Sequence, residues 1–150
     1  MTDHPAPLPR SVVRGLRREA FRQLQSDPRR TAFPAVLHVG RLDAWPAEQD
    51  ACEVPRAVGP GWARDVVEAM LLDRRRAEVT DAWLTRPGDP EPDHLDRVWA
   101  AALREAAAAY ALPPARFFVV TRTGWTQVLT EPAAAPAQRW TRLRLVLPAA

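Results

Sequence analysis

One short apolar run limits the folds open to this chain more than any other feature. Within Arg116–Thr121, the four residues Phe117–Val120 are all apolar, although successive side chains of a strand point to opposite faces. A strand with one wet face alternates apolar and polar residues, whereas a continuous run is typical of a strand covered on both sides. The run therefore predicts a sheet between two helical layers.

The rest of the chain alternates between helical and strand-like segments. Apolar residues recur at helical spacing in three segments, predicting helices over Ser11–Gln25, Trp62–Arg76 and Pro92–Tyr110. Apolar runs predict two more strands, Phe33–Val39 and Glu78–Thr85, and alternation over Arg139–Leu147 predicts a last strand that is antiparallel or at an edge. Because strand–helix–strand connections give parallel strands, we expect an α/β three-layer sandwich with about three helices around a small, mostly parallel sheet of about four strands. An α+β arrangement is the alternative.

Two segments are expected to be irregular. Residues 1–9 contain three prolines and are predicted to form a disordered tail, with residues 10–150 as a single α/β domain. The proline- and glycine-rich stretch Leu42–Gly61 is predicted to be a long loop, with a short extra strand around Glu53–Val58 as an alternative.

Composition excludes several classes of function. All 21 basic residues are arginine, a bias typical of high-GC bacterial genomes that removes the lysine of phosphate-binding loops and of Schiff-base enzymes. The single cysteine, Cys52, forms no intrachain disulfide and no multi-cysteine metal site. With no signal-like or membrane-length apolar run, we expect a soluble cytoplasmic protein without membrane partner, metal or cofactor.

Charge is distributed unevenly along the chain. Residues 1–30 hold seven arginines against three acidic residues, a net of +4. Residues 31–115 hold nine against fourteen, a net of −5, and residues 116–150 hold five against one, again +4. The basic termini suggest weak binding of nucleic acid, but an overall charge of +3 is a poor argument for it on its own.

Two predicted strands end in similar sequences, Thr85-Arg86 followed by Gly88 and Thr121-Arg122-Thr123 followed by Gly124. If the strands are parallel, both ends meet at one edge of the sheet, where open α/β sheets bind ligands. Arginine forks suit phosphate and carboxylate groups. The predicted anion site therefore joins side chains from the ends of three strands, namely His38, Arg41, Thr85, Arg86, Thr121, Arg122 and Thr123.

A second candidate site is an interaction surface. Arginines line the polar side of the first predicted helix, and three of the six tryptophans, Trp45, Trp125 and Trp140, fall in predicted loops or near a sheet edge. The candidate residues chosen from these are Arg14, Arg17, Arg18, Trp125 and Trp140. Exposed tryptophan and arginine are frequent at protein contacts.

No catalytic motif stands out, and a pairing of Cys52 with His38 has no local signature to support it. We therefore expect first a non-enzymatic protein-interaction module, binding a partner protein or itself. The alternatives are a small anion- or phosphoryl-ligand-binding protein or enzyme that uses the strand-end arginines, and a weak nucleic-acid binder that uses the basic termini.

Overall fold

The computed structural model describes residues 7–25, 33–44, 49–55, 57–73, 78–129 and 140–142. In chain order the elements are α1 (Arg10–Gln25), β1 (Ala35–Gly40), β2 (Gln49–Val54), α2 (Pro60–Asp73), β3 (Asp81–Thr85), α3 (His94–Ala109), β4 (Arg116–Thr121), β5 (Gly124–Gln127) and β6 (Trp140–Arg142). The predicted tail up to residue 6 and the predicted strand after Arg142 lie outside the described residues.

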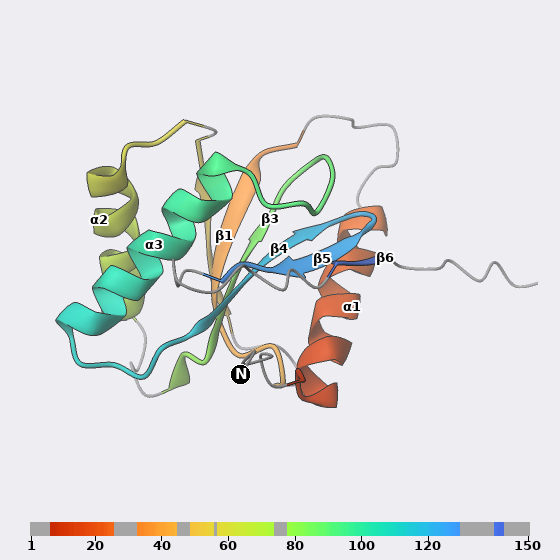
Figure 1. Cartoon of the computed structure of the whole chain (residues 1–150), viewed down its shortest axis with the longest axis horizontal. Helices are drawn as coiled ribbons and strands as arrows, with labels where there is room; N and C mark the ends of the chain where they lie inside the picture. Colours follow the sequence, from red (N-terminus) through yellow and green to blue (C-terminus); the bar gives the residue numbers. More distant parts are fainter. Residues whose placement is uncertain are drawn as a thin grey trace, which may run out of the picture.

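The strands form one mixed sheet in the order β2-β1-β3-β4-β5-β6 (Figure 1). Only β3 and β4 are parallel, and all other neighbours are antiparallel. The α/β class is confirmed, but the expectation of about four mostly parallel strands is wrong, because the described part of the sheet has six strands and most of its pairings are antiparallel.

The error comes from the stretch predicted to be a long loop. The chain turns back after β1 and forms β2, which pairs with β1 in register from Ala35–Val54 to Gly40–Gln49. The crossover helix α2 therefore starts from β2 instead of β1, and it leads to β3 on the other side of β1. A crossover helix joins parallel strands, so β2 and β3 run in the same direction while β1 between them runs in the opposite one.

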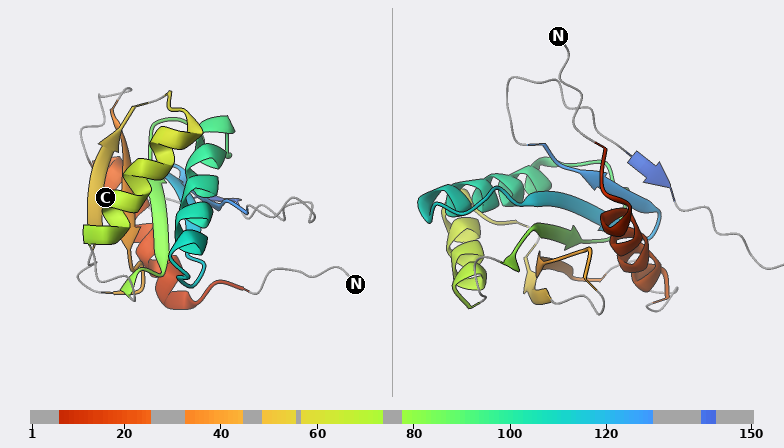
Figure 2. Two further views of the ribbon diagram at one scale, coloured as in Figure 1. Left: turned by 90° about the vertical axis from the view of Figure 1, so that its left-hand side faces the viewer. Right: turned by 90° about the horizontal axis from the view of Figure 1, so that it is seen from below.

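Helices cover both faces of the sheet, with α1 on one side and α2 and α3 on the other (Figures 1 and 2). The side chains of β4 point alternately into the two cores. Phe118 and Val120 pack in the cluster with α1, whereas Phe117 and Val119 pack in the cluster with α2 and α3. All four side chains are buried, as the continuous apolar run predicts.

Helix α1 lies unusually close to the turn that follows β1. Gly15 faces this turn, where a Cβ atom on residue 15 would lie 2.8 Å from the carbonyl carbon of Leu42. Arg18 donates to the carbonyl oxygens of Leu42 and Ala44, at 3.1 and 3.2 Å. Gly15 thus lets α1 approach the turn closely, and the guanidinium group of Arg18 holds the helix there, at the end of β1.

Candidate functional site

The predicted anion site is divided between opposite ends of the sheet. Thr85 pairs with Val120 in the parallel register of β3 and β4, so Thr85, Arg86 and the Thr121–Thr123 turn lie at one end. Because β1 is antiparallel to β3, Gly40 lies beside Asp81 at the other end. Arg41 follows Gly40 there and forms a two-point ion pair with Asp43, at 3.1 and 3.2 Å. The expectation that Arg41 joins the other strand-end arginines is therefore corrected.

Arg86 uses all of its donors within the protein. Its Nε and Nη2 atoms donate to the two carboxylate oxygens of Asp96, at 2.9 and 2.7 Å. Nη1 donates to the carbonyls of Pro87 and Asp89, and Nη2 donates also to that of Glu91. A guanidinium group has five N–H donors, so this arginine organises the β3–α3 loop and has no donor left for a ligand.

The Asp96 carboxylate also takes part in the cap at the N-terminus of helix α3. Asp93 is the N-cap and accepts a hydrogen bond from the backbone N–H of Asp96, while the Asp96 side chain accepts from the backbone N–H of Asp93. Asp96 is completely buried. Burial raises the pKa of its carboxyl group, and the hydrogen bonds from Arg86 and Asp93 act in the opposite direction. The ion pair and the cap together hold the end of β3 against the first turn of α3.

The turn between β4 and β5 engages its own side chains. The hydroxyl oxygens of Thr121 and Thr123 lie 3.2 Å apart, and the Thr121 hydroxyl also accepts from the backbone N–H of Thr123 at 3.3 Å. The guanidinium carbon of Arg122 lies 5.1 Å from the ring centre of Phe33, a cation–π distance. These contacts account for the Thr-Arg-Thr sequence as a turn that closes a hairpin.

His38 is buried on the face of the sheet that α1 covers. Its ring stacks on Trp83 with centroids 5.1 Å apart, and its Nε2 lies 3.1 Å from the hydroxyl of Thr85. Thr85 donates to the carbonyl of Val36, so Nε2 of His38 acts as the donor toward Thr85. Burial lowers the pKa of His38 to about 4, with Arg22 adding to this effect and Gln49 opposing it. The imidazole is therefore neutral at neutral pH.

Cys52 is not positioned to react with His38. In the β1–β2 register Cys52 lies opposite Leu37, whereas His38 lies opposite Ala51. Neighbouring residues of a strand point to opposite faces, and Cys52 packs against the cluster beneath α2 and α3. The pairing of these two residues is thus excluded by the hairpin. Within the described residues, no group of three or more histidine, cysteine or acidic side chains is placed to hold a metal ion.

The arginines of α1 fall into two groups. Arg10, Arg14 and Arg17 are exposed, and within the described residues no carboxylate pairs with them. Arg18, in contrast, is half-buried and anchored to the turn after β1. Of the predicted interaction surface, Arg14 and Arg17 are therefore accessible, whereas Arg18 has a structural role.

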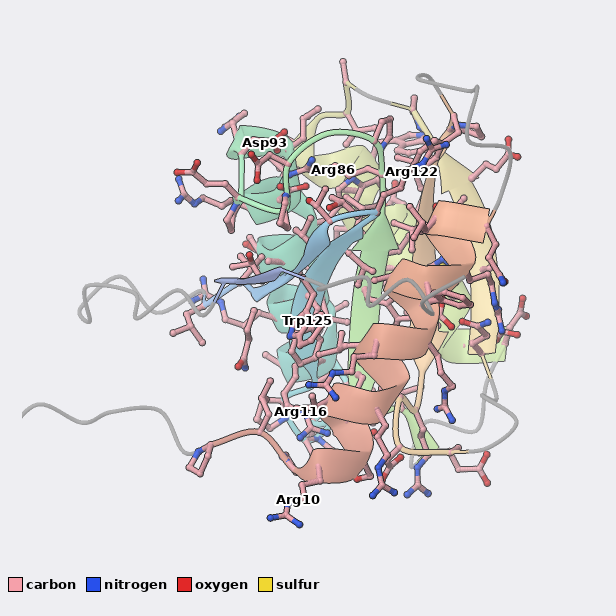
Figure 3. The ribbon with its side chains drawn as sticks, turned by 90° about the vertical axis from the view of Figure 1, so that its right-hand side faces the viewer. Arg10, Arg86, Asp93, Arg116, Arg122 and Trp125 are labelled. Carbon is pink, nitrogen blue, oxygen red and sulfur yellow. The ribbon has the colours of Figure 1, made fainter. Side chains whose placement is uncertain are left out.

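The two tryptophans of the predicted interaction surface do not join these arginines. Trp125 is only 3% exposed and packs in the cluster beneath α1 (Figure 3), so its expected place on the surface is corrected. The side chain of Trp140 lies outside the described residues.

Sequence reasoning missed an exposed aromatic residue that completes the arginine row. Phe21 is 47% exposed and follows Arg10, Arg14 and Arg17 at intervals of four, three and four residues. This spacing places all four side chains on one face of the helix. We call this row, Arg10, Arg14, Arg17 and Phe21, the α1 face. The helical periodicity of the sequence is sufficient to find this row, because it places residues 10, 14, 17 and 21 on one side of the helix.

Comparison with known proteins gives no match to a family model, to a curated protein or to a solved structure. The described helices include none that is both long and apolar enough to cross a membrane. Inferences about function thus depend on the chain's own geometry.

Proposed function

We propose that this protein is a non-enzymatic protein-interaction module that docks an acidic partner on the α1 face. The observation that carries the proposal is the row of three exposed arginines continued by exposed Phe21. Arginine and aromatic side chains are enriched at the energetic centres of protein interfaces. Helix α1 contains five arginines and one glutamate, so its charge favours a negatively charged partner.

The alternative functions have less support. A strand-end anion site loses Arg86, whose donors are engaged, and Arg41, which lies at the other end of the sheet. Nucleic acid could use the arginines of α1, but backbone phosphate contacts give no role to the exposed phenylalanine that ends the arginine row. The single cysteine supports a reducing compartment, the cytoplasm, as the location of this module.

Fluorescence anisotropy with two probes of equal charge tests this proposal. One probe is a helical peptide of leucine and glutamate, and the other is a short DNA duplex. We expect the peptide to bind, and Arg14→Glu and Phe21→Ser each to weaken it by at least about tenfold. The matched control Arg97→Glu reverses an exposed arginine on α3 and should leave binding unchanged.

The DNA duplex provides the opposing outcome. Tighter binding of DNA than of peptide, with a steep salt dependence and no effect of Phe21→Ser, would replace the protein-docking proposal by nucleic-acid binding. Binding of neither probe at 100 mM salt, or equal loss in Arg97→Glu, would refute the α1 face as a docking surface.

A further inference from the structure

Helix α2 carries a second exposed apolar surface on the opposite side of the sheet. Trp62 and Leu72 are 48% and 52% exposed, and together with Phe21 they are the exposed large hydrophobic residues of the described chain. Ala69 is exposed between them. Val66 is half-buried and packs against the core cluster, and the ring of Trp62 meets that of Trp99 of α3 edge-on, with centroids 6.2 Å apart. The spacing of residues 62, 66, 69 and 72 places these side chains within about a third of the circumference of α2. We call this row, Trp62, Val66, Ala69 and Leu72, the α2 face.

Acidic residues accompany the α2 face. Asp65 and Asp73 are exposed, and within the described residues neither has an arginine partner. Arg64, the arginine of this helix, is engaged by Glu68 at 3.0 Å and lies 3.9 Å from Glu105 of α3. The α2 face therefore has exposed negative charge beside it, whereas the exposed Phe21 of the α1 face has positive charge beside it.

The two sides of the sheet differ in charge as a whole. Residues 7–25, which include α1, hold five arginines and one glutamate, a net of +4. Residues 57–109, which include α2 and α3, hold seven arginines and ten acidic residues. Without Asp81, which is buried against Arg116, and without the buried Arg86–Asp96 pair, six arginines and eight acidic residues remain, a net of −2. Helix α1 and the α2–α3 pair lie on opposite faces of the sheet (Figure 2). The molecule thus presents two outward helix faces of opposite charge, each with exposed apolar side chains.

We propose that the acidic partner of the α1 face is the α2 face of a second copy of this chain. This inference rests on the proposed docking function of α1 and names its partner. Because the two faces lie on opposite sides of one molecule, the contact is head-to-tail: each copy offers α1 to one neighbour and α2 to another. Such a contact closes into a ring if the rotation between copies allows it, and otherwise extends as a chain.

Sedimentation velocity over a concentration series, with two single-face variants, tests this arrangement. Arg14→Glu reverses the charge of the α1 face, and Leu72→Arg places a positive charge on the α2 face opposite the arginines of its neighbour. We expect the wild-type chain to show larger species at high concentration, and higher salt to reduce them. Each variant alone should weaken self-association by at least about tenfold.

Mixing the two variants gives the distinguishing result. The Arg14→Glu chain keeps an intact α2 face and the Leu72→Arg chain keeps an intact α1 face, so an equimolar mixture should form a 1:1 heterodimer that grows no further. The matched controls Arg97→Glu and Ala108→Arg, at exposed positions of α3, should associate as the wild type does. Circular dichroism melts of all four variants verify that each is folded.

The outcomes separate this inference from the proposed function. A wild-type chain that stays monomeric at every concentration, or a mixture that forms no heterodimer, overturns head-to-tail assembly. If the acidic peptide still binds and Arg14→Glu still abolishes that binding, the α1 face remains a docking surface for a different acidic protein. If peptide binding fails as well, both proposals fall.

Discussion

Arg86 and Asp96 form a two-point ion pair in which Nη2 lies 2.7 Å from Oδ2, with the Asp96 side chain completely enclosed and that of Arg86 only 14% exposed. The pair joins the carboxyl end of β3 to the first turn of α3, across ten residues of sequence. An arginine that sequence reasoning assigned to ligand binding is thus an internal support of the fold.

Replacing Arg86 should lower the stability of the protein at the connection between β3 and α3, and it should remove no binding site. Arg86→Ala leaves the Asp96 carboxylate buried without its counter-ion, and removing one partner of a buried pair costs about 3–5 kcal/mol. Urea denaturation should show this loss in the free energy of unfolding. The double variant Arg86→Ala/Asp96→Ala should be less destabilised than the sum of the two single variants. Strict additivity would show that the two side chains do not depend on each other.

The cap of α3 allows a smaller and independent test. Asp93→Ala removes the side chain that accepts from the backbone N–H of Asp96, and loss of an N-cap aspartate costs about 1 kcal/mol. His94→Ala, at the next, exposed position, is the matched control and should change the free energy of unfolding by less than about 0.5 kcal/mol. An equal effect of both substitutions would indicate that the cap contributes nothing.

His38 should make the stability of the protein depend on pH. Its pKa is about 4 in the folded state and 6.5 in the reference state, so between these values the unfolded chain binds more protons. Stability therefore rises with pH across this window. Lowering the pH from 7.5 to 5 should cost about 2 kcal/mol from this group alone, given 1.36 kcal/mol per pKa unit.

A pair of variants isolates this contribution. His38→Gln removes the titrating group, and the difference in unfolding free energy between pH 7.5 and pH 5 should shrink by about 2 kcal/mol. His94→Gln is the matched control, because it makes the same substitution at an exposed position at the start of α3. An unchanged profile in His38→Gln would show that the imidazole has the same pKa in the folded and unfolded chain.

The helices and the central strand were predictable because their signals lie in the side chains. The β4 range of Arg116–Thr121 matches the predicted strand, and α1 begins one residue before the predicted helix. Burial on both sides of β4 follows from four consecutive apolar residues. Hydrophobic periodicity reports which surfaces are covered, so it identifies elements that contribute to the core.

Strand β2 was predicted only as an alternative, around Glu53–Val58, and it lies four residues earlier; strand β5 was missed. Much of the pairing of both strands depends on the backbone. In β2 the residues Gln49, Asp50 and Glu53 are polar, and the strand is held at the edge of the sheet by its register with β1. Strand β5 has only four residues and returns directly after the turn at Arg122 and Thr123. Missing β2 reversed the inferred direction of β1, and this error placed Arg41 at the wrong end of the sheet.

The role of Arg86 was hidden for a related reason. Nothing in the residues beside Arg86 shows that its partner lies ten positions later, inside the first turn of a helix. One signal was nevertheless available: Asp93 and Asp96 have the spacing of a capping box, which predicts that Asp96 folds back onto the loop. A carboxylate fixed there is a natural partner for an arginine at the preceding strand end.

Gly15 gives the sharpest test of how α1 is seated on the sheet. In a helix interior, glycine is less favourable than alanine by about 1 kcal/mol, so Gly15→Ala should stabilise a helix that had free space around it. Here the new Cβ would lie 2.8 Å from the carbonyl carbon of Leu42 and 3.0 Å from its Cβ. The helix would have to move away from the turn and loosen the contact that buries Trp83 and Phe118. We therefore expect a lower melting temperature for Gly15→Ala, whereas Gly61→Ala, in α2 with nothing within 4 Å, should leave it unchanged or raise it.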